Sequence, residues 1–162
     1  RVGGHFYLSS DVTYPPNNGA ILNVARVIDT VMSSAAEAEL GALFINAREA
    51  VHLRRILAEL GHPQPKTPIQ MDNSTAEGVI NHKIQPKRTK AMDMRYHWLR
   101  GRESQEQLFI HWKAGKTNHA DYFTKHHPPL HHVNIRSSYL ATIRDLAEAR
   151  RQKLQGQTNT AS

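Results

Sequence analysis

Three acidic residues stand where side chains from separate structural elements can meet. Glu39 falls in the first turns of a predicted helix, Asp72 ends a predicted strand, and Asp121 lies in the first turn of a predicted short helix. Two Mg²⁺ ions about 3.5–4 Å apart stabilise both the attacking and the leaving oxygen of a phosphodiester, and Mg²⁺ prefers hard oxygen ligands. The three acids therefore permit metal-assisted hydrolysis of a phosphodiester.

Each acid also has a structural interpretation. Ser34 can cap the long helix, and Glu37 is then placed to complete a capping box, which leaves Glu39 without such a role. Asp72 could end its strand and cap the next helix, and Asp121 could be the capping acid of its own short helix. The residue types alone leave these alternatives open.

The spacing of apolar residues predicts an α/β chain. Residues 4–9 and 20–28 have the pattern of two strands around a turn-rich segment, so they are expected to form an antiparallel hairpin. Further elements are expected as helices at 35–60, 73–81, 91–102, 118–124 and 138–154, and as strands at 68–71 and 108–112. Gly61 is expected to end the long helix, and both Trp98 and Trp112 are expected to face the core. This order of elements is typical of a mixed sheet.

The composition favours one basic domain. The 162 residues carry 21 lysines and arginines against 14 acids, a formal net charge of +7, which suits a polyanionic partner such as nucleic acid. The absence of cysteine excludes disulfides and thiolate zinc sites, and no apolar run is long enough to predict a membrane span. We expect a domain at residues 1–135, a C-terminal helix at 136–154 and a disordered tail at 155–162.

Four segments resemble, in their order, the sequence elements of one known family. They are residues 33–43 (SSAAEAELGAL), 71–76 (MDNSTA), 88–97 (RTKAMDMRYH) and 118–125 (NHADYFTK). Together they resemble the ribonuclease H domain of copia-type retrotransposon polyproteins, which has a serine-rich E-A-E element, then D-N-x-x-A, R-T-K-x-x-D-x-R-Y-H and A-D-x-F-T-K elements. The resemblance covers about residues 3–125.

The resemblance implies a fold and an activity. The fold would be a ribonuclease H-like mixed sheet with helices on both faces, with the first strand missing from this fragment. The activity would be hydrolysis of the RNA strand of an RNA–DNA hybrid, with Mg²⁺ or Mn²⁺ as cofactor. The family's four acids follow the order Asp, Glu, Asp, Asp. Carried over, the last three are Glu39 (preferred to Glu37), Asp72 and Asp121.

The first aspartate of the family would lie upstream of Arg1, so we expect little or no nuclease activity from these 162 residues alone. The basic element suggests Lys87, Arg88 and Lys90 as contacts to the substrate backbone. His119 could help proton transfer or product release, or be a surface histidine.

The resemblance also implies a cellular context. A reverse transcriptase domain would precede this one in the same polyprotein, and the protein would reside in cytoplasmic virus-like particles, or in the nucleus. The alternative is a degenerate relic that binds nucleic acid without cleaving it, favoured by Ala35 where the family often has threonine and by His126 after Lys125. An integrase-type member of the superfold would need a D, D, E order, which these motifs do not follow. A zinc site among His126, His127, His131 and His132 is not expected.

Overall fold

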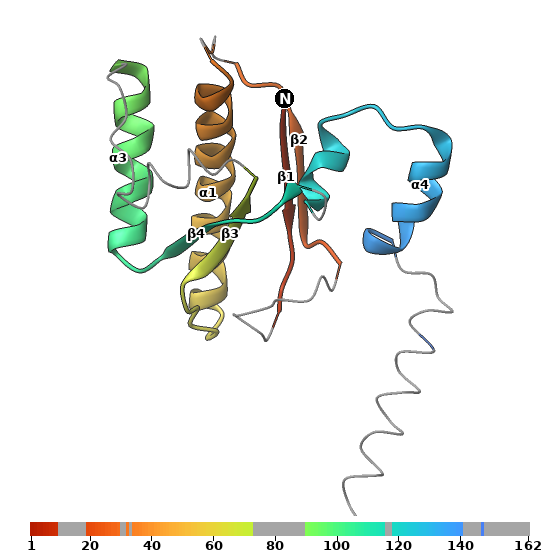
Figure 1. The fold of residues 1–162 in the computed structure, drawn as a ribbon. Helices are drawn as coiled ribbons and strands as arrows, with labels where there is room; N and C mark the ends of the chain where they lie inside the picture. Colours follow the sequence, from red (N-terminus) through yellow and green to blue (C-terminus); the bar gives the residue numbers. More distant parts are fainter. Residues whose placement is uncertain are drawn as a thin grey trace, which may run out of the picture.

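The computed structural model describes residues 1–9, 19–29, 32, 34–72, 90–115, 118–140 and 147. Within these residues, two small sheets lie beside one long helix (Figure 1). The elements in chain order are β1 (Val2–Phe6), β2 (Leu22–Arg26), α1 (Ala35–Glu59), β3 (Thr67–Met71), α3 (Lys90–Ser104), β4 (Leu108–Trp112), the 3-10 helix η2 (His119–Phe123), α4 (Pro129–Ile135) and the 3-10 helix η3 (Arg136–Ser138).

The two sheets differ in direction. β1 pairs with β2 antiparallel, from Val2 opposite Arg26 to Phe6 opposite Leu22, which confirms the predicted hairpin. β3 pairs with β4 parallel, in a register that places Met71 opposite Trp112. Parallel strands need a long crossover, and here the connection includes α3. The chain is therefore a mixed α/β structure.

Helix α1 begins and ends at residues whose chemistry explains the boundaries. The hydroxyl of Ser34 accepts a hydrogen bond from the backbone N–H of Glu37 at 3.1 Å, which satisfies one of the free donors of the first turn. Gly61 has φ of +87°, and the N–H groups of Gly61 and His62 bond back to the carbonyls of Ala58 and Leu57. This is a Schellman ending, and the predicted stop at Gly61 is confirmed.

The core lies between α1, α3 and the second sheet. Its buried side chains are Leu40, Leu43, Ala47 and Ala50 of α1, Met71 of β3, Tyr96 and Leu99 of α3, and Leu108 and Ile110 of β4. Helical spacing on α1 and alternation on β4 place these residues on the inward faces. Phe44 and Trp98 meet edge to face, with ring centroids 5.2 Å apart, and join α1 to α3.

Two adjacent glycines show that helices cover both faces of the first sheet. A Cβ added at Gly4 would collide with Oδ1 of Asn46 on α1, and one added at Gly3 would collide with the carbonyl oxygen of Ala120 on η2. Because successive residues of a strand point to opposite faces, α1 and η2 lie on opposite sides of β1. Helices therefore cover both faces of this sheet, which agrees with the expected mixed α/β fold, built in the described residues on two small sheets.

A cavity separates the two sheets. β1 and β3 both contact α1 and run in opposite directions (Figure 1), yet within the described residues no strand pairing joins them. The space is a cleft partly open to solvent, with a volume of about 730 Å³, and its walls include β1, β3 and α1 from Asn46 to Leu57. A cleft of this size has room for a further segment of chain.

Three of the side chains that line the cavity hold a buried polar atom without a hydrogen-bond partner among the described residues. These atoms are Oδ1 of Asn46, Nε2 of Gln70 and Nδ1 of His111. The other polar atom of the Asn46 amide, Nδ2, donates a hydrogen bond to the backbone carbonyl of Gly3 on β1 at 2.8 Å. Buried polar groups are nearly always paired, so these atoms point to an additional polar occupant.

The close contact at Gly3 leads to a stability prediction. Gly3→Ala is expected to lower the free energy of unfolding by about 1–3 kcal/mol, because the backbone of Ala120 must move to admit a methyl group. The matched control is Gly101→Ala in α3, where an added Cβ meets nothing within 4 Å and helix propensity improves. Urea unfolding followed by circular dichroism measures both. Equal stability of the two variants would contradict the close packing of η2 on β1.

Two sequence expectations need correction. Trp112 was expected to face the core, but it is 51% exposed. Alternation places it on the same face as Leu108 and Ile110, but it stands at the end of β4, past the buried core, where its indole N–H donates to the backbone carbonyl of Asp72. Helix α4 was not predicted at all. Its signal was Pro129 in the first turn, where the missing N–H and the fixed φ of proline favour a helix start.

The remaining predicted elements fall largely outside the described residues. The helix expected at 73–81 and the tail at 155–162 lie wholly outside them, and so does most of the helix expected at 138–154. None of the described helices is long and apolar enough to cross a membrane.

Candidate active site

Asp121 is carried by η2, and the cap of this short helix is another residue. The side-chain oxygen of Asn118 accepts a hydrogen bond from the N–H of Ala120 at 3.1 Å, so Asn118 is the cap. Thr124 donates twice to the backbone carbonyl of Asp121, from its N–H and from its hydroxyl, each at 3.0 Å. The backbone of Asp121 is thus fixed, and its carboxylate is left with no capping role.

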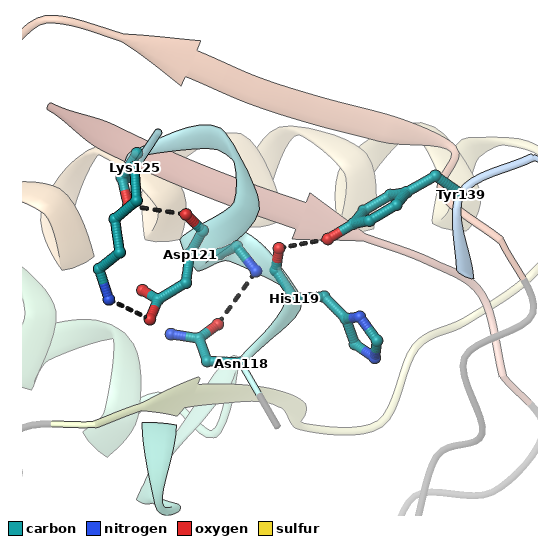
Figure 2. A network of polar contacts seen from close by, with 7 residues as sticks. Asn118, His119, Asp121, Lys125 and Tyr139 are labelled. Atoms are coloured by element: carbon teal, nitrogen blue, oxygen red, sulfur yellow. Dashed lines mark hydrogen bonds and ion pairs between the residues drawn. The ribbon is translucent and has the colours of Figure 1, made fainter. Parts of the chain in front are cut away.

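The carboxylate of Asp121 has one close partner. Nζ of Lys125 lies 2.5 Å from Oδ2 of Asp121, one helical turn further along the chain (Figure 2). The pKa of Lys125 is raised, chiefly by this hydrogen bond and by the charge of Asp121, and further by the charge of Asp72. Both acids therefore act on the same ammonium group.

Asp72 comes directly after β3, as predicted. Its backbone carbonyl accepts a hydrogen bond from the indole N–H of Trp112 at 3.0 Å. Its carboxylate lies against the loop after β4, where a Cβ added at Gly115 would stand 3.1 Å from Oδ2. A side chain at position 115 would crowd this carboxylate, so the glycine leaves Asp72 the room it occupies.

The two glutamates of α1 have different surroundings. Glu37 is 7% exposed, and its N–H is the one that Ser34 caps. Glu39 is partly buried, and its Oε2 is a buried oxygen without a hydrogen-bond partner among the described residues. A carboxylate oxygen in this situation is expected where a cation would complete the environment. The preference for Glu39 over Glu37 stays a prediction.

Of the three candidate acids, the described structure relates only Asp72 and Asp121 to each other. Asp72 and Asp121 share the electrostatic environment of Lys125, but no group of three histidine, aspartate or glutamate side chains in the described part is close enough to hold one metal ion. The candidate ligand atoms of Glu39, Asp72 and Asp121 are all carboxylate oxygens, which suit Mg²⁺ or Mn²⁺. Glu39 is therefore a candidate ligand by its buried, unpartnered oxygen, and the other two by their shared surroundings.

His119 precedes Asp121 on η2 but faces elsewhere. Its ring points away from the carboxylate of Asp121 (Figure 2) and contacts the rings of His5 and Tyr139, with centroids 5.5 and 5.9 Å apart. Burial, followed by the charges of His5 and Lys113, lowers the pKa of His119, which favours the neutral imidazole. The described geometry gives this ring no contact with the candidate acids.

A cluster of tyrosine and histidine rings that includes Tyr122 of η2 was not predicted from the sequence. The hydroxyl of Tyr122 and Nδ1 of His132 are 2.8 Å apart, and the rings of His127 and His131 stack with centroids 4.1 Å apart. Tyr139 stacks on Tyr122 and donates a hydrogen bond to the carbonyl of His119. Burial raises the pKa of Tyr139 to about 12, with the charges of Tyr122 and Asp121 adding to the effect. The cluster ties α4 and Tyr139 to the helix that carries Asp121.

Of the basic residues expected to contact substrate, Lys90 is the first residue of α3, and Lys87 and Arg88 are outside the described residues. Further along this helix, the guanidinium of Arg102 lies over the ring of Trp98 at 4.9 Å and that of Arg95 lies over Phe44 at 6.0 Å. Such stacking orients a guanidinium while its positive charge is kept.

One comparison with known proteins relates the chain to transposon polyproteins. The chain is 32% identical over 109 residues to a retrovirus-related Pol polyprotein from transposon TNT 1-94 of Nicotiana tabacum. The aligned part covers 67% of the chain and 8% of that polyprotein. No protein-family model matches the chain, and no solved structure matches it. The similarity supports the retrotransposon-polyprotein part of the resemblance drawn from the four motifs.

Proposed function

We propose that the chain is the ribonuclease H domain of a retrotransposon polyprotein and takes part in hydrolysis of the RNA strand of RNA–DNA hybrids. The observation that carries this proposal is the placement of Asp72 and Asp121. They come from separate elements, the end of β3 and the 3-10 helix η2, and both act on the ammonium of Lys125. Separate elements that present carboxylates to a common point suit a site for divalent cations.

In the proposed mechanism Glu39, Asp72 and Asp121 would hold Mg²⁺ or Mn²⁺ through carboxylate oxygens. When bound, the metal would activate water and neutralise charge on the phosphodiester. The chain's own part is positioning. Trp112 fixes the backbone that carries Asp72, and Thr124 fixes the backbone that carries Asp121. Fixed ligands lose little freedom on binding, which favours a defined site.

A strand that precedes Val2 in a longer polyprotein would complete both the sheet and the acids. β1 and β3 run in opposite directions, so one strand placed between them can be antiparallel to β1 and parallel to β3. The cavity and its unpartnered polar atoms support such an occupant. The fourth carboxylate of the family would be carried by this strand.

The substrate would be held mainly by its backbone phosphates. Lys87, Arg88 and Lys90 stay our choice for these contacts, and the net charge of +7 supports attraction to a polyanion. Binding that depends on phosphates weakens steeply with salt. In its polyprotein the domain would follow a reverse transcriptase domain and act in virus-like particles.

The test is cleavage of a labelled hybrid by a longer polyprotein fragment that includes the preceding segment. With Mg²⁺ we expect cleavage of the RNA strand of the hybrid, no cleavage of duplex DNA, and loss of all cleavage with a chelator. Restored cleavage on readdition of Mn²⁺ would separate metal removal from unfolding. Cleavage that survives the chelator would contradict the proposed mechanism.

The second candidate function is that of a degenerate nucleic-acid-binding module. It is favoured by the described residues, which hold no group of three metal-binding side chains, and by the lysine bound to Asp121. The same experiment separates the two functions, because the degenerate module would bind the hybrid with strong salt dependence and leave it intact under all metal conditions.

A further inference from the structure

Lys125 is the last residue of the fourth motif, and the proposed mechanism gives it no role. Its ammonium is 2.5 Å from Oδ2 of Asp121 and also within the electrostatic influence of Asp72. The side chain of Lys125 is 60% exposed and that of Asp121 31% exposed, so solvent ions reach the pair. An isolated exposed pair of this kind contributes little stability. Its location beside a second carboxylate suggests another role.

Of the three charged groups, the ammonium is the one most free to move. Two hydrogen bonds from Thr124 fix the backbone of Asp121, and the methyl group of Thr124 lies near Gly3 of β1. The backbone of Asp72 is fixed by Trp112. Lys125 reaches the acids through a flexible four-carbon stem. The backbone that carries each acid therefore does not depend on the lysine.

We propose that Lys125 is a positioning residue that supplies the positive charge at Asp121 while no divalent cation is bound, and that releases Asp121 when a cation binds. This inference rests on the proposed function of the acids as metal ligands. Carboxylates fixed near one another repel, and a nearby cation offsets this repulsion. A divalent ion must compete with the ammonium, since both need Oδ2 of Asp121.

The experiment measures Mn²⁺ affinity by calorimetric titration, after removal of metals, in the 162-residue chain and in the upstream-extended fragment. Lys125→Gln is expected to bind Mn²⁺ roughly twofold to fivefold more tightly than the wild type, the range expected for loss of one exposed ionic competitor. Lys125→Arg keeps the charge and is expected to bind like the wild type.

Lys66→Gln is the matched control for charge. Lys66 is an exposed lysine in a 2.8 Å ion pair with Glu106, so its removal lowers the net charge equally without touching the acids. Its Mn²⁺ affinity is expected to match that of the wild type. Thermal unfolding without metal adds a second readout, in which Lys125→Gln lowers Tm and Mn²⁺ restores it.

A double-mutant cycle with Asp121→Asn separates the possible outcomes. Tighter binding caused by Lys125→Gln alone, and abolished in the Asp121→Asn background, supports the inference. Unchanged or weaker binding by Lys125→Gln overturns it and leaves an ordinary surface pair. Mn²⁺ binding that Asp121→Asn does not weaken overturns both the inference and the proposed metal site, so the two failures are distinguishable.

Discussion

Asp121→Asn and Asp72→Asn are each expected to lower the rate of hybrid cleavage at least roughly 100-fold in an upstream-extended fragment that is active. Loss of a residue that only supports a metal ligand typically costs 10–100-fold in metal affinity or activity, so loss of a ligand should cost at least the upper value. Asparagine keeps the size of the side chain but removes its charge. The measurement is the single-turnover rate of RNA-strand cleavage at fixed Mg²⁺.

The control for these substitutions is Glu59→Gln, which neutralises an exposed acid in the last turn of α1. Its rate should stay within about twofold of the parent, because exposed charges far from a site have small effects. Both aspartate variants should also unfold at temperatures close to that of the parent. If either keeps more than a tenth of the parental rate while correctly folded, that acid is not a metal ligand.

The second prediction with a large expected effect is that a strand filling the cavity stabilises the chain. A chain extended upstream by a strand-forming segment is expected to be more stable than the 162 residues alone by at least about 2 kcal/mol, because each large apolar side chain newly buried contributes roughly 1.5–3 kcal/mol before the cost of ordering. Hybrid cleavage should rise from background by at least roughly 100-fold, since the fourth carboxylate is supplied at the same time.

A matched control extends the chain by a Gly/Ser segment of equal length, which cannot bury apolar surface and should change neither stability nor cleavage. Hydrogen exchange gives a local readout. The backbone groups of Thr67 and Met71 bond toward β4, so by alternation the amide of Gln70 points to the opposite edge of β3, and slower exchange is expected there only in the strand-forming extension. Cleavage by the 162-residue chain at a rate near that of the extended fragment would show that the site needs no further strand.

Much of the fold followed from local sequence patterns. The stripe of apolar residues on α1, the glycine stop at Gly61 and the strand at residues 108–112 depend on neighbours in the chain, and the structure confirms each. The burial of Trp112 was predicted wrongly, because alternation assigns it to the face of Leu108 and Ile110, whereas how far the core extends along that face depends on tertiary packing.

Less of the candidate site could be predicted from the sequence. The positions of Asp72 after its strand and of Asp121 in its short helix were predictable, yet the ion pair of Asp121 with Lys125 and the effect of the Asp72 charge on that lysine depend on tertiary packing, including that of η2 against β1 at Gly3. That packing joins residues more than 100 positions apart, which no local pattern encodes. The unpartnered oxygen of Glu39 likewise arises from tertiary burial.

The hydrogen bond from Trp112 to the carbonyl of Asp72 has a spectroscopic consequence. The sequence holds two tryptophans, and Trp98 packs beside the core under Arg102, whereas the indole of Trp112 is half exposed and directly attached to the segment that carries a candidate ligand. In a Trp98→Phe background the remaining emission would come from Trp112. The protein thus contains an intrinsic fluorophore that reports on the neighbourhood of Asp72 without any label.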